Sequence, residues 1–172
     1  MIRVVTGDLA SQAVGAVVRP IRSDLSPVDA LSRDLAVAAG AALDRRLEKI
    51  GSMPLGGAVM TPAGDLAADF IIHVVVMSDD DPQSGLTMQK ALRNGLRRAA
   101  DWALESMALP PLGIGVGTLE AEESARALVE ILFDHLEDGQ PPRELVIVVG
   151  SPYHSDLFTR LVDEGKRARE IG

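Results

Sequence analysis

The chain has 172 residues, the size of one globular domain with a sizeable core, and no cysteine, which excludes disulfides and thiolate metal sites. Hydrophobic residues make up 47% of the sequence and charged residues 24%, proportions that exclude a disordered chain. The 25 acidic and 17 basic residues give a formal net charge of -8, which argues against unaided binding of long nucleic acid or an anionic membrane.

Six short apolar runs, bounded by Gly, Pro or Asp, are predicted to be buried strands. They are residues 2–5, 16–18, 58–61, 70–76, 112–114 and 145–149. The last run contains no polar residue, which is typical of a strand covered on both faces.

A helix is predicted after the second strand, with its N-cap at Ser26 and a proline, Pro27, at its first position. A second helix is predicted to open at Asp81 and Pro82. Five of its apolar residues are expected to face the core: Leu86, Leu92, Leu96, Ala99 and Ala103.

The third predicted helix repeats its apolar residues with the 3.6-residue period between Ala125 and Leu136. The fourth starts at Ser151 and Pro152 and is expected to end near Gly165. Residues 1–165 are therefore expected to form a single domain, followed by a charged tail, residues 166–172, that frays.

Strands that alternate with helices predict an α/β fold, with a mixed or parallel sheet and helices on both faces. In such sheets ligands bind beyond the carboxyl ends of the strands. The loops after residues 5, 18, 114 and 149 are therefore the places where a functional site is expected.

The loop over residues 111–118 has three glycines at alternate positions, Gly113, Gly115 and Gly117. Between a strand and a helix, the backbone N–H groups of such a loop can bind an anion. A tight turn that needs positive φ explains the same glycines. The spacing matches neither a Walker loop nor a dinucleotide-binding fingerprint.

Asp8 follows the first predicted strand, within Thr6-Gly7-Asp8-Leu9. A carboxylate at this place can accept a hydrogen bond from an exocyclic amine or a ribose hydroxyl. An aspartate that bonds its own backbone in a turn is the commoner arrangement, and the residues alone leave both open.

Four segments in chain order resemble motifs of the macro domain family. Residues 6–9 (TGDL) resemble its G-D-[IL] opening, and residues 56–64 (GGAVMTPAG) and 70–75 (FIIHVV) resemble two of its strands. Residues 111–117 (PLGIGVG) resemble the phosphate loop of one bacterial branch. The resemblance implies a three-layer α/β/α sandwich, with a mixed, mostly parallel sheet of about six strands, that binds ADP-ribose. Some members remove ADP-ribose from proteins or deacetylate O-acetyl-ADP-ribose.

The chain departs from the family after the second strand, where the motif N-A-A-N-S-x-L and a glycine triplet are usual. Arg19 and Arg22 stand at the two asparagine positions, and the glycines are absent. In the family the second asparagine contacts the distal ribose and supports hydrolysis, while the glycines wrap the phosphates. An arginine cannot replace a neutral amide, but it can bind a phosphate through two hydrogen bonds.

The resemblance implies a site for ADP-ribose or a related adenine nucleotide. Asp8 would hold the adenine amine, Leu9 would line that pocket, Arg22 would contact a phosphate, and Tyr153 would cover the base, although surface packing explains Tyr153 equally well. The phosphate loop would contribute Gly113, Ile114, Gly115, Val116 and Gly117.

The same departure implies binding without efficient hydrolysis, so no catalytic residue is expected. A hydrolase is the first alternative, in which Asp24 or Asp29 would position the water. A macro-fold scaffold without ligand is the second, acting through protein contacts such as those with a second copy of the chain. An ADP-ribosylated protein is a further expected partner.

No cofactor or metal is expected, and the Asp79-Asp80-Asp81 run is interpreted as a solvated loop. His73, inside an apolar run, is expected to be a satisfied core histidine. Ser151, His154 and Asp156 share one helix turn, so they cannot form a catalytic triad. No apolar run approaches the length of a membrane span, and the first residues lack the features of a signal peptide, so the cytoplasm is the expected location.

Overall fold

Six strands form one sheet in the order β1-β6-β5-β2-β4-β3, in a computed structural model that describes residues 1–80, 84–113 and 121–171. The strands are β1 (Ile2–Thr6), β2 (Ala16–Arg22), β3 (Ala58–Pro62), β4 (Phe70–Met77), β5 (Ser106–Leu109) and β6 (Glu144–Val149). Only the β3–β4 pair is antiparallel; the other four pairs are parallel. The predicted mixed, mostly parallel sheet is confirmed.

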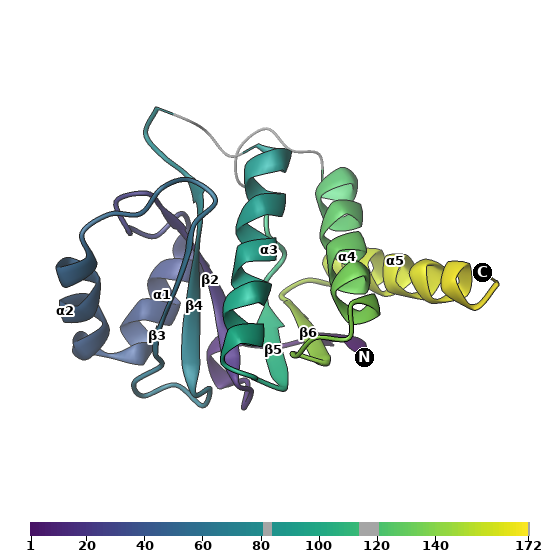
Figure 1. The fold of residues 1–172 in the computed structure, drawn as a ribbon, viewed down its shortest axis with the longest axis horizontal. Coiled ribbons are helices and arrows are strands. Elements are labelled where there is room, and N and C mark those ends of the chain that lie inside the picture. The colour runs from purple at the N-terminus through teal and green to yellow at the C-terminus, as the bar shows by residue number, and fades with distance from the viewer. Residues whose placement is uncertain (81–83, 114–120, 172) are drawn as a thin grey trace.

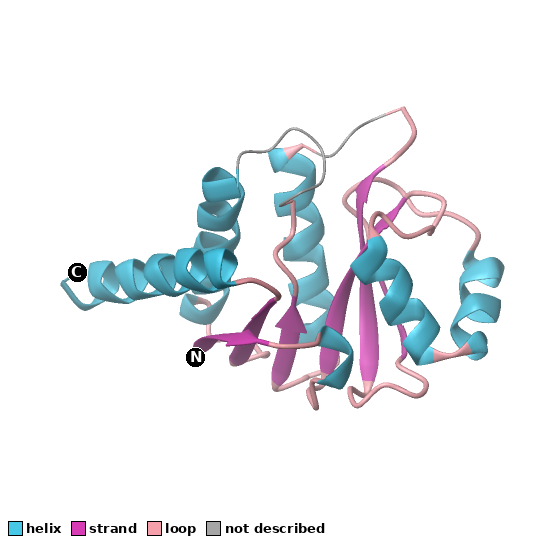
Figure 2. Cartoon of the chain, turned by 180° about the vertical axis from the view of Figure 1, so that it is seen from behind, coloured by secondary structure: helices cyan, strands magenta, loops and turns pink. Residues whose placement is uncertain are grey.

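Helices cover both faces of the sheet (Figure 1). They are α1 (Ala30–Ala39), α2 (Ala41–Ile50), α3 (Gly85–Asp101), α4 (Ala121–Glu137) and α5 (Pro152–Ile171), with a short 3-10 helix, η1 (Leu9–Ser11). Figure 2 shows the sheet from behind, with α5 running away from its β1–β6 side. None of the helices in the described residues is long and apolar enough to span a membrane.

Two apolar clusters, one on each side of the sheet, make the three layers. The larger joins α3, α4 and α5 to one face, and the smaller joins α1, α2 and η1 to the other. The two clusters divide the side chains of β6: Leu145, Ile147 and Val149 pack into the first, and Val146 and Val148 into the second. This central strand is buried on both faces, as its unbroken apolar run predicts.

The prediction of a strand at residues 112–114 is wrong. The fifth strand is β5, which ends at Leu109, and Leu112 and Gly113 lie in a turn. Pro110 and Pro111 separate the two segments, and a proline has no N–H to continue the ladder of hydrogen bonds. The strand therefore ends before the prolines, and the apolar residue after them is buried in the loop.

The second strand and first helix also differ from prediction. Strand β2 continues past Val18 to Arg22, so the loop at its carboxyl end begins four residues later than expected. Helix α1 is capped by Asp29 and not by Ser26, because Asp29 forms a capping box with Ser32. The helical region is broken at Gly40, whose φ of 104° only glycine adopts readily.

Two predicted core residues of the next helix are exposed. Helix α3 is capped by Ser84, and Leu86 in its first turn is 81% exposed. Ala103 lies beyond the helix end in a turn, with a φ of 53°. The other three, Leu92, Leu96 and Ala99, are buried as expected. The predicted opening of the helix at Asp81 and Pro82 lies outside the described residues.

The last helix does not end near Gly165. Helix α5 continues to Ile171, so residues 166–171 are helical instead of a frayed tail. Gly165 is buried inside the helix, against the ring of Phe133. The guanidinium of Arg169 lies 4.2 Å from the centre of the same ring, which holds the ring between α4 and α5.

Substituting Gly165→Ala tests this packing. An alanine Cβ would overlap the Phe133 ring, so we expect the free energy of unfolding to fall by about 1–3 kcal/mol. At an open helical position the same change would stabilise the protein by about 1 kcal/mol. Urea denaturation measures the difference, and Phe133→Leu in the same chain should restore part of the loss. An unchanged or higher stability would contradict the contact.

Candidate functional site

A cleft lies where β1, β6, β5 and β2 end, and its volume is about 210 Å³. Gly7 and Leu9 line it after β1, Val149 and Gly150 at the end of β6, and Pro110 and Pro111 after β5. Pro20, Asp29 and Leu31 close it on the side of β2 and α1, and His154 closes it from α5. The cleft is therefore at the edge where the alternation of strands and helices predicts a ligand site.

Asp8 lies between two residues that line the cleft, Gly7 and Leu9, which places it at the rim; it is exposed and is not itself a lining residue. Its Oδ1 caps η1 by accepting a hydrogen bond from the amide of Ala10 at 3.1 Å. Among the described residues no donor is bonded to Oδ2, so this oxygen is free to accept another hydrogen bond. Leu9 follows, 2% exposed, and forms part of the apolar wall. The aspartate is thus both a turn residue and an available acceptor.

The wall opposite Leu9 comes from the β6–α5 junction. The hydroxyl of Ser151 accepts the amide of His154 at 3.2 Å, so it caps the helix and is not a nucleophile paired with that imidazole. His154 turns into the cleft, while Tyr153 is 61% exposed and is not among the lining residues. The tyrosine and histidine rings lie 5.5 Å apart.

The β5 end supplies the start of the glycine loop. Gly113 is buried and has a φ of 84°, so this glycine is required by its backbone conformation. Residues Ile114, Gly115, Val116 and Gly117, predicted to bind phosphate, lie outside the described residues.

The β2–α1 loop is folded tightly on itself. The amide of Arg22 donates to the carbonyl of Ser26 at 2.9 Å, and the amide of Leu25 donates to the carbonyl of Arg22 at 2.8 Å. Leu25 holds a φ of 71°, which is unusual for a leucine, and its side chain is buried against Ile21 and Val75. The loop is therefore anchored in the core and does not form an open cradle.

Most of the backbone donors of this loop are already used. The amides of Ser23, Ser26, Val28 and Asp29 donate to partners in the protein, in addition to those of Arg22 and Leu25. A proline follows Ser26 and has no N–H. Only the amide of Asp24 in residues 22–29 has no such bond, so the loop has little to offer a phosphate.

The two aspartates of this loop have separate tasks. Asp24 is exposed, and the hydrogen bonds donated by the hydroxyl and amide of Ser26 lower the pKa of its carboxyl group. Asp29 faces the cleft, but one of its oxygens accepts the amide of Ser32 at 2.8 Å to cap α1. Both carboxylates are held by local hydrogen bonds.

Arg22, at the end of β2, forms an ion pair with Asp79, with 3.6 Å between Nη1 and Oδ1. Its side chain is about one-third exposed and does not line the cleft as the structure stands. A phosphate contact would require the guanidinium to leave Asp79, which is itself 89% exposed. Among the described residues no group of three acidic or histidine side chains could hold a metal ion.

Arg19, in β2, is 2% exposed and points away from the cleft, toward α1 and α2. Its Nε donates to the carbonyl of Ser32 at 2.8 Å, and its Nη1 lies 3.3 Å from Nδ1 of His73. Burial lowers the pKa of Arg19 to about 10, opposed by the charges of Asp44 and Asp29, so the side chain remains protonated at neutral pH.

His73 is fully buried and has a partner on each ring nitrogen, which confirms the expected core histidine. Arginine has no acceptor atom, so Nδ1 accepts from Arg19, and the proton on Nε2 is donated to Oγ1 of Thr61 at 2.9 Å. Burial, and secondarily the charge of Arg19, lower the pKa of His73 to about 3.

The sequence prediction and the geometry agree in part. Leu9 and the end of β1 lie in the cleft, with Asp8 at its rim and Gly113 in the turn beyond Pro111. Arg22 and Tyr153 are near but turned elsewhere. Pro20, Leu31 and His154 were not predicted. The sequence pattern around His154 suggests only a triad that its helical spacing excludes, and no sequence signal marks Pro20 or Leu31.

Comparison with known proteins gives a consistent picture. The family model described as "Macro domain" matches residues 18–128. A macro domain-containing protein of Caldanaerobacter subterraneus (TTE0995) is 26% identical over 169 residues, covering 95% of this chain and 96% of its own. A protein of Enterobacter cloacae named O-acetyl-ADP-ribose deacetylase is 28% identical over 176 residues, covering 99% and 98%.

Solved structures match the fold. The macrodomain of Oceanobacillus iheyensis, solved with ADP, superposes with a TM-score of 0.85 at 18% identity, over 96% of this chain and 91% of that one. The macrodomain of Trypanosoma brucei, also solved with ADP, gives 0.84 at 16% identity, over 94% and 68%. At these identities the likeness concerns the fold.

The buried histidine predicts a pH dependence of stability. His73 stays neutral in the folded protein, whereas the unfolded chain binds a proton below a pKa of about 6.5, so stability falls as the pH decreases toward 3. Between pH 7 and pH 5 the loss from this residue should be about 2 kcal/mol. Urea denaturation of His73→Gln should show lower stability at pH 7 and a loss between the two pH values smaller by this amount. An equal loss in both proteins would assign the dependence to other groups.

Proposed function

Because the chain belongs to the macro domain family, we propose that it binds ADP-ribose or a related adenine nucleotide in the cleft at the carboxyl ends of β1, β6, β5 and β2. The observation that carries this proposal is the conjunction of Asp8 and Leu9 at the cleft rim. A free carboxylate oxygen stands beside an apolar wall, the combination that recognises a purine bearing an exocyclic amine.

The base would lie between Leu9 and the β6–α5 junction. In this position its amine donates to Oδ2 of Asp8, and His154 borders the ring. Tyr153 is one residue away on the first turn of α5 and is 61% exposed, so it would cover the base after a change of rotamer that gives up only its contact with the His154 ring.

The phosphates would rest on the glycine loop and on Arg22. Most amides of the loop between β2 and α1 already donate hydrogen bonds within the protein. The backbone donors for the phosphates would therefore have to come from the glycine loop: Gly113, Ile114, Gly115, Val116 and Gly117. Arg22 would leave Asp79 to bind a phosphate. The free-energy cost of breaking this ion pair is small, because an exposed ion pair contributes only about 0–1 kcal/mol.

We propose binding without efficient turnover. Hydrolysis would require a group that positions water near the distal ribose, and the asparagine position that serves this purpose in the family holds Arg22. Asp29 lines the cleft, but one of its carboxylate oxygens caps α1, and Asp24 lines a different cavity. Neither stands at the position of that asparagine, so we propose that neither replaces it in hydrolysis.

Titration calorimetry of the Asp8→Asn variant tests the proposed adenine contact. Asparagine caps a helix as well as aspartate, so η1 should remain intact and the melting temperature unchanged. The hydrogen bond to a charged acceptor is lost, so the Kd for ADP-ribose should rise about 10- to 100-fold. The wild-type preference for AMP over IMP, which lacks the amine, should disappear in the variant.

The matched control is Asp163→Asn, which removes one negative charge from an exposed site on α5. Its affinity should equal that of the wild type. If wild-type protein shows neither heat nor thermal shift with millimolar ADP-ribose, AMP or ADP, the cleft is not a nucleotide site and the scaffold alternative takes its place.

Turnover is tested with O-acetyl-ADP-ribose, because a relative carries the name of that deacetylase. We expect acetate release no faster than in buffer over hours, measured by chromatography, since Arg22 stands at the position from which the family's asparagine supports hydrolysis. Release that is saturable and is abolished in Asp24→Asn or Asp29→Asn, with folding retained, would establish the hydrolase alternative instead.

A further inference from the structure

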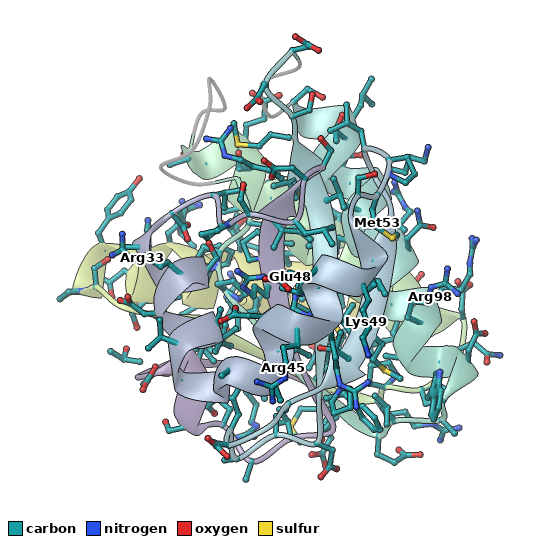
Figure 3. All side chains as sticks on the ribbon, turned by 90° about the vertical axis from the view of Figure 1, so that its left-hand side faces the viewer. Arg33, Arg45, Glu48, Lys49, Met53 and Arg98 are labelled. Atoms are coloured by element: carbon teal, nitrogen blue, oxygen red, sulfur yellow. The ribbon has the colours of Figure 1, made fainter. Side chains whose placement is uncertain are left out.

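A second cavity, of about 540 Å³, lies at the lateral edge of the sheet that β3 forms, between α2 and β3. Its rim is formed by three basic residues of α2, Arg45, Arg46 and Lys49, and its floor by Met60 and Thr61 of β3. Strand order places β3 last in the sheet, so one side of this strand has no neighbour. Figure 3 faces this side, with Arg45 and Lys49 on α2 and Arg98 beyond them on α3.

Only some of the backbone N–H and C=O groups on the outer edge of β3, at the floor of this cavity, have a hydrogen-bond partner. Gly56 has a φ of 78°, and its amide and the carbonyl of Gly57 both pair with Val75, so the two glycines make a bulge where β3 begins. From there the register alternates, and the backbone groups of Ala58, Met60 and Pro62 point away from β4.

Side chains of α3 occupy the start of this free edge. Asn94 donates to the carbonyl of Gly56 at 2.6 Å, and Nε of Arg98 donates to the carbonyl of Ala58 at 3.3 Å. Among the described residues, nothing pairs with the outward N–H and C=O of Met60. Pro62 has no N–H, so the Met60 pair is the centre of the open edge.

The charge beside this edge is uniform. Arg45 and Arg46 are adjacent and precede Lys49 by four and three residues, so each of them neighbours Lys49 on the surface of α2. All three are exposed, and none forms an ion pair within the part of the chain that the structure describes. The acids of the same helix, Asp44 and Glu48, line a different cavity, toward α1. A local positive stripe in a chain of net charge -8 thus stands without internal partners.

We propose that this edge binds an extended acidic peptide segment of a partner protein, which adds a strand beside β3 and places its carboxylates against Arg45, Arg46 and Lys49. Main-chain hydrogen bonds to Met60 set the register, and alternate side chains of the added strand reach α2. The lysine and arginines select acidic partners, because a basic strand would be repelled and its edge pairing lost.

A polyanion such as a nucleic acid would use the basic stripe but not the strand edge. Phosphates accept hydrogen bonds and donate none, so the groups that bind the basic stripe could not pair with the carbonyl of Met60. A peptide strand satisfies both groups, which is why the geometry favours it. This function is independent of the nucleotide cleft, which lies at the carboxyl ends of other strands.

Fluorescence anisotropy with labelled peptides of about ten residues, the length of a long strand, tests the proposal. A peptide of alternating Glu and Val should bind saturably and more weakly as salt is raised. Alternating Lys and Val should not bind. The same acidic peptide with N-methyl groups on alternate amides keeps its charge but cannot pair with an edge, and it should bind at least about tenfold more weakly.

Two variants locate the site. Arg45→Ala/Arg46→Ala/Lys49→Ala should weaken binding about tenfold or more, while alanine preserves the helix. The matched control Arg3→Ala/Lys166→Ala/Arg167→Ala changes net charge equally at exposed positions elsewhere and should bind as the wild type does. Met60→Pro removes one outward donor without touching the β3–β4 pairing, and it should also weaken binding.

The proposal is overturned if the acidic peptide does not bind, if its N-methylated form binds equally well, or if both triple variants lose affinity to the same extent. It is also overturned if a single-stranded oligonucleotide binds with the same dependence on the α2 stripe while the peptide does not. Circular dichroism of each variant confirms that a lost affinity is not a lost fold.

Discussion

The buried guanidinium of Arg19 is the interaction on which the arrangement around the cleft depends. It joins three strands and a helix: Arg19 comes from β2, His73 from β4 and Thr61 from β3, and the carbonyl of Ser32 belongs to α1. A buried charge without hydrogen bonds costs several kcal/mol, so each partner has to stay in place. A histidine kept neutral by burial is the partner that an arginine requires, since it can accept a hydrogen bond without adding a second positive charge.

This network determines the course of the chain between β2 and α1. Ser32 is tied to Arg19 through its carbonyl and to Asp29 through the capping box, so the start of α1 is fixed close to the sheet. The residues before it then fold into a tight loop whose amides are paired internally and whose Leu25 is anchored in the core. The buried arginine and the closed loop between β2 and α1 are therefore two parts of one arrangement.

Local sequence patterns correctly predicted those elements whose own residues are sufficient to specify them. The apolar runs of β4 and β6 form strands because both faces of these strands are buried, and the TGDL segment places Asp8 between Gly7 and Leu9, which line the cleft. The errors come from signals that tertiary packing overrules. Ser26 and Asp29 are both good caps, and the capping box between Asp29 and Ser32, whose carbonyl also accepts from Arg19, favours the second. The sequence makes Gly165 a reasonable helix end, but the residue lies inside α5, where the Phe133 ring leaves no room for a Cβ. The orientations of the Arg22 and Tyr153 side chains could not be predicted from the sequence. An ion pair with Asp79 orients Arg22, and Tyr153 is exposed, so its rotamer is not fixed by burial.

The cleft and the β3 edge differ in electrostatics, and this difference would separate the two proposed functions. The cleft has one cation nearby, Arg22, and it is neutralised by Asp79, so an anionic nucleotide would gain little from long-range attraction to a chain of net charge -8. The affinity of the proposed site would have to come from short-range contacts: the base against Leu9, the amine on Asp8, the donors expected from the glycine loop, and Arg22 after it leaves Asp79. The β3 edge is the reverse, with three unpaired cations and few contacts of other kinds. Binding at the edge should therefore depend strongly on ionic strength, and binding in the cleft should not.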